Sequence, residues 1–316
     1  MQVLSGVFQL GRLPFASGEN AEVDVAYWTC GQRNAADDNT ILVCHGSSGS
    51  KDWALPYCRP GGALDPERWF IVSVDLPGGG ESSRRSRQSD FPARYSVEDC
   101  TNVLVRCLDA LGVRSVRAFC GPSMACLLGL DLGVRYPERT RGLVLWAGGW
   151  RSDRYAQFTI ETMRDILSLS DSQAAFRAAV SATLPALTGR DFIEALPRDR
   201  RAALLSELSN DWARRWRADE LSARYAALAV ADIGAAVGGE AELARRIACP
   251  VIWLQVASDA LFPIADIQRL AASMRNAELK VLESSLGHLA SIAGPGSREF
   301  EFFDRETARF LEAIDA

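Results

Sequence analysis

The sequence predicts an α/β fold, with a mostly parallel, doubly wound sheet that is interrupted by a helical insertion. Short apolar segments bounded by turn residues alternate with helix-like segments, and several of the apolar runs are continuous. This alternation stops near Trp150 and resumes at Pro250. Continuous apolar runs are typical of strands covered on both faces. Their alternation with helices indicates a doubly wound sheet.

The predicted strands are short apolar runs, at residues 40–44, 70–74, 116–120, 142–146, 250–256 and 279–282. Helix-like segments lie between them at residues 97–111, 124–136 and 264–273. The opening section, residues 3–29, is interpreted as a pair of antiparallel strands that precedes the first parallel unit.

The insertion is rich in Ala, Arg, Leu, Glu and Asp and has few β-branched runs, so we expect it to be helical. The expected helices are 156–168, 172–183, 198–216 and 220–237, and the second and third follow Ser- and Asp-rich breaks that can cap them. We therefore divide the chain into a first core part (1–150), a helical cap (151–247) and a second core part (248–316).

Composition limits the partners of this chain. Its 316 residues are 48% hydrophobic, which permits a large core. The 40 acidic and 35 basic residues are mixed along the chain, so we expect no basic face and no nucleic-acid partner. The first residues lack a basic segment followed by an apolar one, and no window of about 18 uncharged apolar residues occurs. We expect a soluble, cytoplasmic protein without a membrane partner.

The cysteines and histidines do not predict a metal site. Eight cysteines are scattered without a CxxC pair, and the chain has two histidines, His45 and His288. A zinc site of Cys and His ligands is hard to build from this set, and free buried thiols are expected. No phosphate-binding G-x-x-x-x-G-K and no dinucleotide fingerprint is present, so we expect no cofactor.

Ser123 is the candidate nucleophile. It lies in Gly121-x-Ser123-x-Ala125, between an apolar strand and an amphipathic helix. This is the setting of a nucleophile elbow, where a strained turn exposes the serine oxygen and small neighbours make room for the turn. The alternative is a buried serine that caps the helix. Its neighbours along the chain favour the elbow.

A nucleophilic serine needs a base, and the base needs a carboxylate that fixes its tautomer. His288 follows the last predicted strand in a polar, glycine-containing loop, and Asp259 directly follows the strand 250–256. The chain order Ser123, Asp259, His288 is that of the α/β-hydrolase fold. Asp232 and Asp266 are interpreted as cap and helix-surface residues.

The loop after the first parallel strand is the candidate oxyanion hole. We expect the main-chain N–H groups of Ser47 and Met124 to stabilise the charge of a tetrahedral intermediate, with Ser48 as a weaker alternative to Ser47. His45 and Gly46 begin this loop. His45 is read as a hydrogen-bonded structural residue or as a substrate contact, and Gly46 as a position that leaves the backbone open.

Several segments carry a family resemblance: Ala26-Tyr, His45-Gly, Pro60-Gly-Gly-Ala-Leu-Asp-Pro-Glu-Arg-Trp-Phe-Ile-Val, Gly121-Pro-Ser-Met, Arg135-Tyr-Pro-Glu-Arg, Ser258-Asp-Ala-Leu-Phe-Pro and Gly287-His. With them, the chain resembles the homoserine O-acetyltransferase-like branch of the α/β hydrolases over nearly its whole length. The resemblance implies an esterase or acyltransferase whose nucleophile, acid and base are Ser123, Asp259 and His288. It also implies a homodimer formed through the cap.

Other segments differ from that branch. Its transferases have glycines around the serine, where this chain has Pro122, Ala125 and Cys126, and an aspartate where this chain has Leu289. The stretch Val74-Asp-Leu-Pro-Gly-Gly-Gly-Glu-Ser-Ser is similar to the D-x-P-G-x-G-x-S segment of ordinary ester hydrolases. These differences argue against homoserine as the substrate.

Candidate substrate contacts are the aromatic residues of the loop and cap, because catalytic pockets are mainly apolar with a few polar anchors. They are Trp53, Trp150, Tyr155, Trp212 and Trp216, with Phe158 as a further candidate. Packing between cap and core is the alternative for each. Arg214, Arg215 and Arg217 are read either as a clamp for a carboxylate or as a solvated helix face.

The function predicted from these residues is hydrolysis of a small-molecule carboxylic ester through an acyl-enzyme on Ser123. The alternative is an O-acyltransferase that moves an acetyl group from acetyl-CoA to a hydroxyl, because both reactions use the same three residues. A third reading is a non-catalytic ligand-binding protein with the same pocket. The intact triad argues against that reading.

Overall fold

The computed structural model describes residues 2–314. Within them, eight strands form one sheet in the order β1-β2-β4-β3-β5-β6-β7-β8. The strands are β1 (Val3–Pro14), β2 (Asn20–Cys30), β3 (Thr40–Cys44), β4 (Phe70–Val74), β5 (Ala118–Pro122), β6 (Leu143–Trp146), β7 (Val251–Val256) and β8 (Ala277–Leu282). β1 pairs with β2 and β2 with β4 in antiparallel fashion, and the other pairs are parallel. The predicted fold class is confirmed.

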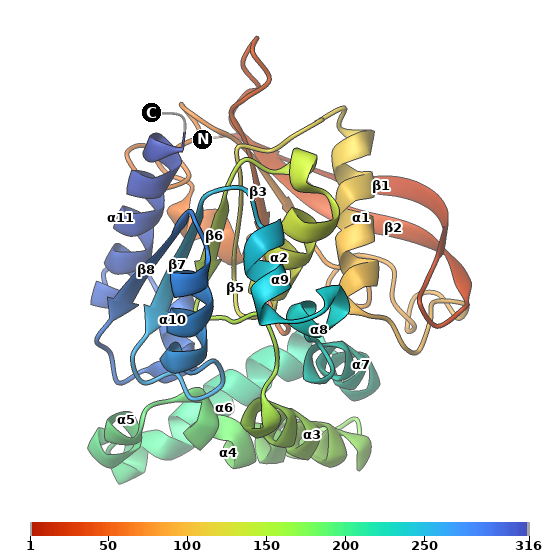
Figure 1. Cartoon of the computed structure of the whole chain (residues 1–316). Helices are drawn as coiled ribbons and strands as arrows, with labels where there is room; N and C mark the ends of the chain where they lie inside the picture. Colours follow the sequence, from red (N-terminus) through yellow and green to blue (C-terminus); the bar gives the residue numbers. More distant parts are fainter. Residues whose placement is uncertain (1, 315–316) are drawn as a thin grey trace.

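The central strands are apolar throughout because both faces of the sheet are covered. Along β6, Leu143 and Leu145 belong to the core on one face, and Val144 and Trp146 to the core on the other. On the first face lie α1 (Val97–Ala110), α2 (Met124–Arg135) and α10 (Ile264–Ser273), and on the second lie the 3₁₀ helix η1 (Lys51–Tyr57) and α11 (Arg298–Ala313) (Figure 1). α11 is not among the predicted elements.

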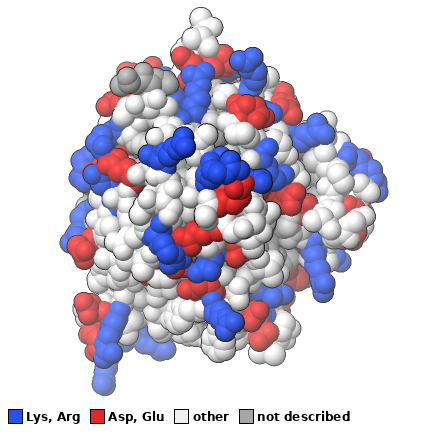
Figure 2. Space-filling model, in the orientation of Figure 1, with Lys and Arg blue, Asp and Glu red and all other residues white. Residues whose placement is uncertain are grey.

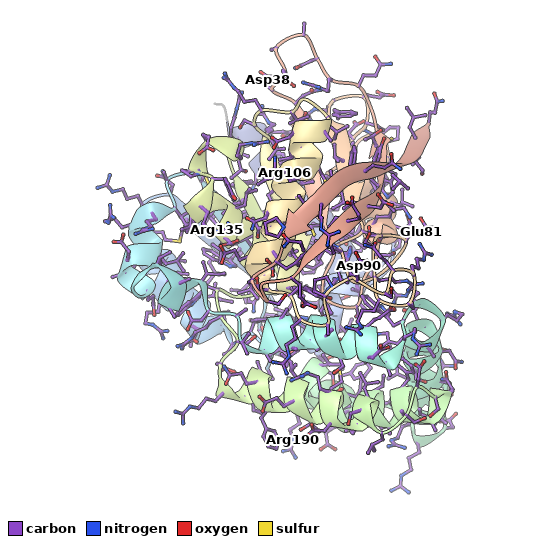
Figure 3. The ribbon with its side chains drawn as sticks, turned by 90° about the vertical axis from the view of Figure 1, so that its right-hand side faces the viewer. Asp38, Glu81, Asp90, Arg106, Arg135 and Arg190 are labelled. Carbon is purple, nitrogen blue, oxygen red and sulfur yellow. The ribbon has the colours of Figure 1, made fainter. Side chains whose placement is uncertain are left out.

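Five helices of the predicted cap form a separate layer below the sheet in Figure 1, and from here on the cap means these five helices. They are α3 (Arg154–Ser168), α4 (Gln173–Leu187), α5 (Arg190–Ala195), α6 (Arg198–Arg215) and α7 (Ala218–Ala229). Figure 3 places Arg190 in this layer and Asp38 at the opposite end of the molecule. The insertion is therefore helical, as predicted. Its boundaries at 150 and 247 stay a prediction.

The expected single helix over 220–237 is wrong. α7 ends at Ala229, and a separate helix α8 (Ile233–Val237) follows. The Asp232 side chain accepts a hydrogen bond from the backbone N–H of Ala235 at 2.8 Å, and so caps the start of α8. Asp favours such positions over a helix interior, because its carboxylate pairs with free N–H groups of the first turn. α8 and the next helix, α9 (Glu240–Arg246), pack against α2.

Charged side chains of both signs are intermingled on the face shown in Figure 2. Many form ion pairs, such as Arg269 of α10 with Glu240 of α9 at 2.9 Å. None of the helices between residues 2 and 314 combines the length and apolar character needed to cross a bilayer. The eight cysteines are free thiols, and Cys249 is the one that is not fully buried. This confirms the prediction of free thiols.

Candidate active site

Ser123 lies at a strained turn between β5 and α2. Its backbone angles are φ 57° and ψ −121°, a region that a residue with a side chain rarely occupies. The turn is held because Ser123 N donates a hydrogen bond to Trp146 O of the neighbouring strand β6 at 2.8 Å. Such strain costs on the order of 1–3 kcal/mol and is tolerated where the surrounding structure enforces it.

Two glycines make room for this turn. A Cβ atom on Gly121 would lie 2.4 Å from Cys44 O and 2.5 Å from the Ala125 side chain. A Cβ atom on Gly148 would lie 2.6 Å from Ser123 O. The sequence motif is therefore explained by backbone packing, since Ala125 fits only if position 121 has no side chain.

Ser123, His288 and Asp259 form one chain of hydrogen bonds. His288 Nε2 lies 2.9 Å from Ser123 Oγ, and His288 Nδ1 lies 2.8 Å from Asp259 Oδ2. His288 belongs to the 3₁₀ helix η3 (Gly287–Ile292), which follows β8, and Asp259 follows β7. The carboxyl ends of β5, β7 and β8 thus bring together three residues that are far apart in the sequence.

Asp259 is fixed on its other oxygen by two backbone donors. Its Oδ1 accepts hydrogen bonds from Leu261 N at 2.9 Å and from Phe262 N at 3.2 Å. The side chain is fully enclosed, with 0% of its surface exposed. Asp259 can therefore orient His288 and stabilise it when it becomes protonated.

Two main-chain N–H groups border the nucleophile. Met124 N begins α2, and the first N–H groups of a helix have no acceptor within the helix. On the other side Gly46 approaches closely, since a Cβ atom on it would lie 3.2 Å from Ser123 Cβ. Ser47 follows Gly46 and lines the same cavity as Ser123. The two expected oxyanion donors thus belong to segments that border Ser123, and their role stays a prediction.

His45 holds the peptide group that carries the Ser47 N–H. His45 Nδ1 lies 2.6 Å from Gly46 O, and Leu76 N donates to His45 Nε2 at 3.1 Å. Burial, aided by the Arg224 charge, lowers the pKa of His45 to about 4, so the ring is neutral and donates from Nδ1. In a trans peptide the carbonyl and the N–H point in opposite directions. Because Gly46 O is held by His45, the Ser47 N–H is directed away from His45.

Asp75 anchors the far end of this loop, a role that sequence reasoning missed. Its Oδ1 accepts from Lys51 N at 2.7 Å and its Oδ2 from Glu81 N at 2.9 Å. Gly80, at φ 58°, leaves room for the carboxylate, since a Cβ atom there would lie 2.4 Å from Asp75 Cγ. The signal for this role is the D-x-P-G-x-G-x-S stretch, which contains both Asp75 and Gly80.

Ser123 and His288 open onto a cavity of about 460 Å³ between the sheet and the cap. Its wall is mainly apolar and includes Ile160, Met163, Val180, Leu208, Leu261 and Phe262. The ionisable side chains on the wall, apart from His288 and Tyr225, are Asp52, Asp211 and Arg215. The size and lining suit a small organic molecule.

Comparison with known proteins agrees with this geometry. Residues 39–295 match the family described as the alpha/beta hydrolase fold. The chain belongs to this family. It is therefore an enzyme of the α/β-hydrolase class, which includes esterases and acyltransferases.

The proteins similar to this α/β hydrolase include acyltransferases and ester hydrolases. A homoserine O-acetyltransferase of Salinibacter ruber is 28% identical over 306 residues, covering 84% of this chain and 87% of that protein. An acetylester hydrolase of Corynebacterium glutamicum has a similar structure, with a TM-score of 0.88 and 20% identity. The match covers 98% of this chain and 96% of that chain. The structure of a homoserine O-acetyltransferase of Bacillus anthracis is also similar, with a TM-score of 0.86 and 17% identity. The match covers 98% of this chain and 98% of that chain. The fold is therefore common to both kinds.

Some expected substrate contacts of this α/β hydrolase do line the cavity. Gly46, Trp53 and Trp212 are on its wall together with Ser47. Tyr225, which sequence reasoning missed, also lines it. Burial raises the pKa of Tyr225, and hydrogen bonding to the Ser47 and Ser48 hydroxyls opposes that rise. The side chain thus lies against the oxyanion loop.

Four expected contacts are corrected, because the structure places them off the cavity wall. His45 is buried behind the oxyanion loop, where it bonds Gly46 O. Trp150 is buried against Gly234 and below the Arg151 guanidinium.

The other two corrected contacts belong to the cap. Tyr155 turns outward and is 52% exposed, and its neighbour on the same helix, Phe158, is 73% exposed. Trp216 packs against Gly79, and its indole N–H donates to Ser48 O at 3.1 Å. Tyr155 lies on the outer side of α3, one residue before the expected helix 156–168, and Trp216 stands just after α6 ends at Arg215. The expected helices did not specify which face of α3 meets the core. The spacing of Ala156, Ile160 and Met163 marks the apolar face of α3 that meets the core, and Tyr155 and Phe158 lie outside that face.

The three arginines of the cap differ in their surroundings. Arg215 reaches the cavity, and its Nη1 donates to Ser48 O at 2.7 Å. Arg214 is 70% exposed, and Arg217 pairs with Asp171 at 3.3 Å. They do not converge on one point of the cavity. The interpretation of the three as a joint carboxylate clamp is corrected.

Proposed function

We propose that this α/β hydrolase cleaves the carboxylic ester of a small molecule through an acyl-enzyme on Ser123. The observation that carries the proposal is the hydrogen-bond chain from Ser123 Oγ through His288 to Asp259, with distances of 2.9 and 2.8 Å. A serine hydroxyl becomes an effective nucleophile when a base within hydrogen-bond reach accepts its proton.

In the first half of the reaction, Ser123 Oγ attacks the acyl carbon while His288 Nε2 takes the hydroxyl proton. Asp259 accepts a hydrogen bond from the N–H at His288 Nδ1 and stabilises the imidazolium that forms. The N–H groups of Met124 and Ser47 donate to the oxyanion of the tetrahedral intermediate. The intermediate collapses when the ester C–O bond breaks and His288 gives its proton to the departing alkoxide, which leaves the acyl group on Ser123.

In the second half, water takes the place of the alcohol. His288 accepts a proton from the water as its oxygen bonds to the acyl carbon, and a second tetrahedral intermediate forms on the same donors. The bond to Ser123 Oγ then breaks and His288 returns the proton to that oxygen. The products are the free acid and the unmodified enzyme.

The cavity wall favours water over an amino-acid acceptor. Within the described part of the chain, Arg215 is the one Lys or Arg on that wall. Its guanidinium already pairs with Asp211 and with Ser48 O. An acceptor with a carboxylate would have to displace these partners, whereas water needs no such clamp.

The second candidate is an O-acyltransferase, in which an alcohol attacks the acyl-enzyme in place of water. The name of the Salinibacter ruber relative favours it. The same triad and the same oxyanion donors would serve this reaction, because only the second acceptor differs.

Turnover with and without an acceptor separates the two candidates. The protein is incubated with p-nitrophenyl acetate alone, and with acetyl-CoA and a panel of alcohols. The hydrolase predicts continuous release of p-nitrophenol without an alcohol, and no release by Ser123→Ala. A single burst without turnover in water, followed by rapid transfer once an alcohol is added, would contradict the hydrolase and support the transferase.

A further inference from the structure

The cap is tied to the oxyanion loop through one backbone oxygen. Arg215 Nη1 donates to Ser48 O at 2.7 Å, and Trp216 Nε1 donates to the same oxygen at 3.1 Å. A carbonyl oxygen has two lone pairs and can accept both bonds. Ser48 adjoins Ser47, whose N–H is one of the two proposed oxyanion donors. The end of α6 therefore contacts the loop one residue from this donor.

Both donors are held in place by their own neighbours. Arg215 Nε donates to Asp211 Oδ1 at 3.1 Å, one turn earlier on α6. Trp216 is buried, with Arg224 stacked over its ring at 5.4 Å and Gly79 beneath it, where a Cβ atom would lie 2.1 Å from the ring. The guanidinium and the indole are thus fixed before any substrate arrives.

The loop is also held on the opposite side of Ser47. Gly46 O accepts hydrogen bonds from His45 Nδ1 at 2.6 Å and from Gly49 N at 3.1 Å. Gly46 O shares its peptide plane with the Ser47 N–H and is held by the core, whereas Ser48 O lies two peptide units further along and is held by the cap. The chain is thus restrained both before and after Ser47, which limits rotation of the backbone between these two points.

We propose that Arg215 and Trp216 are positioning residues, which hold Ser48 O so that the Ser47 N–H stays aimed at the oxyanion. The oxyanion hole is then complete only with the cap in place. This assigns Arg215 to the shape of the loop and not to binding a substrate carboxylate. The proposal rests on the proposed function, because it needs an oxyanion to form at Ser123.

Single substitutions remove one donor each. Trp216→Phe keeps the ring and deletes the N–H, and Arg215→Met keeps the length and deletes the guanidinium. Loss of a whole oxyanion donor lowers kcat by about 10²–10³-fold, so a loosened donor should lower it by about tenfold. KM should change less than twofold, since the ester binds before the oxyanion exists. Arg215→Lys, which can still donate to Ser48 O, should recover part of the loss.

Matched controls come from neighbouring residues. Arg214→Met makes the same chemical change on an exposed side chain that does not reach Ser48. Trp150→Phe deletes a buried indole N–H that has no acceptor among the described residues. Both should keep the wild-type kcat. Thermal unfolding of each variant reports its folding. If Arg215→Met fails to fold, the comparison of Trp216→Phe with its control Trp150→Phe tests the positioning role by itself.

The experiment measures three quantities for each variant: kcat and KM for p-nitrophenyl acetate, the affinity of a trifluoromethyl ketone, and the rate at which a fluorophosphonate labels Ser123. The ketone adds to the serine and forms an oxyanion, so its affinity should fall in parallel with kcat for Trp216→Phe and Arg215→Met.

The outcomes separate the two proposals. If the fluorophosphonate does not label the wild-type protein, the proposed function fails. If it labels the wild type, Trp216→Phe and Arg215→Met at equal rates, the positioning role is wrong and the proposed function stands. A rise in KM for Arg215→Met with unchanged ketone affinity would also overturn the positioning role, because it would place Arg215 in substrate binding.

Discussion

At the scale of single residues, the hydrogen bond between Asp259 and His288 predicts how Asp259→Asn changes kcat. Asp259→Asn keeps the size of the side chain but replaces the oxygen that accepts from His288 Nδ1 by an amide, which favours the wrong tautomer. In a serine protease of another fold with the same triad, the equivalent change lowers kcat by about 10⁴-fold, and we expect a loss of that order here. Steady-state ester hydrolysis measures it.

Asp266 provides the control for this change. It pairs with Arg151 at 2.9 Å on the outside of α10 and does not touch His288. Asp266→Asn should keep kcat within twofold. If Asp259→Asn retained wild-type kcat, Asp259 would not be the orienting acid.

The lowered pKa of His45 predicts that the stability of the fold depends on pH. Its pKa is lowered to about 4 in the folded protein by burial, whereas an unfolded histidine has a pKa of about 6.5. Above pH 6.5 the ring is neutral in both states and contributes no pH dependence. Between pH 6.5 and 4 the unfolded state gains a proton that the folded state does not accept. The free energy of unfolding should therefore fall across this window, by on the order of 3 kcal/mol.

Urea unfolding at several pH values tests this behaviour. His45→Asn has no ionisable group and keeps an N–H₂ that can donate to Gly46 O. The variant should be less stable than the wild type at pH 7 and should lose less stability on acidification. Equal losses in the two proteins between pH 6.5 and 4 would show that His45 accepts a proton in the fold.

At the scale of elements, the junction of β5 and α2 is the least tolerant point of the fold. Gly121→Ala would place a Cβ atom 2.4 Å from Cys44 O, a backbone atom of β3 that cannot move without disturbing the sheet. We expect a loss of about 3 kcal/mol or more in the free energy of unfolding, typical of overpacking in a core. Gly294→Ala is the control, since a Cβ atom there meets nothing within 4 Å.

Chemical denaturation compares the two glycine variants. Gly294→Ala should stay within about 0.5 kcal/mol of the wild type. A Gly121→Ala protein as stable as the wild type would mean that the elbow is not packed as described.

The elements that could be predicted from sequence are those with local signals. The strands before Ser123 and Asp259 are largely apolar, whereas the strand before His288 mixes apolar residues with Glu278 and Lys280. Parallel strands bring their carboxyl ends to one edge. The break before α8 was missed because Asp232 follows apolar and helix-forming residues that carry the helical pattern past Ala229. Asp75 was missed because the D-x-P-G-x-G-x-S stretch contains the aspartate but does not show its partners, and Lys51 N and Glu81 N are main-chain groups that leave no trace in residue type.

The cavity wall was harder to predict for a different reason. Whether an aromatic side chain of the cap meets the cavity depends on the rotation of its helix and on the path of the chain between helices. Trp212 and Trp216 are one turn apart, yet only Trp212 lies on the wall. From the sequence pattern alone, the same position on the cavity wall is expected for both residues.

At the scale of the whole molecule, a homodimer through the cap stays a prediction. α3 presents Tyr155 and Phe158 on its outer face, 52% and 73% exposed. Light scattering after size exclusion should then give twice the mass of one chain. Phe158→Glu should shift the protein towards the monomer without loss of fold. A monomer for the wild type at micromolar concentration would contradict this interface.

The expected cytoplasmic location stays a prediction. Fractionation of the source cells tests it. The protein in the secreted fraction would contradict it.

The central claim is that Ser123 carries the acyl group. Mass spectrometry of the protein quenched in acid during turnover of p-nitrophenyl acetate tests it most directly. We predict one added acetyl group on the peptide that contains Ser123, absent in Ser123→Ala and lost with time as water completes the reaction. An acetyl group on another residue, or turnover by Ser123→Ala at the wild-type rate, would contradict the account.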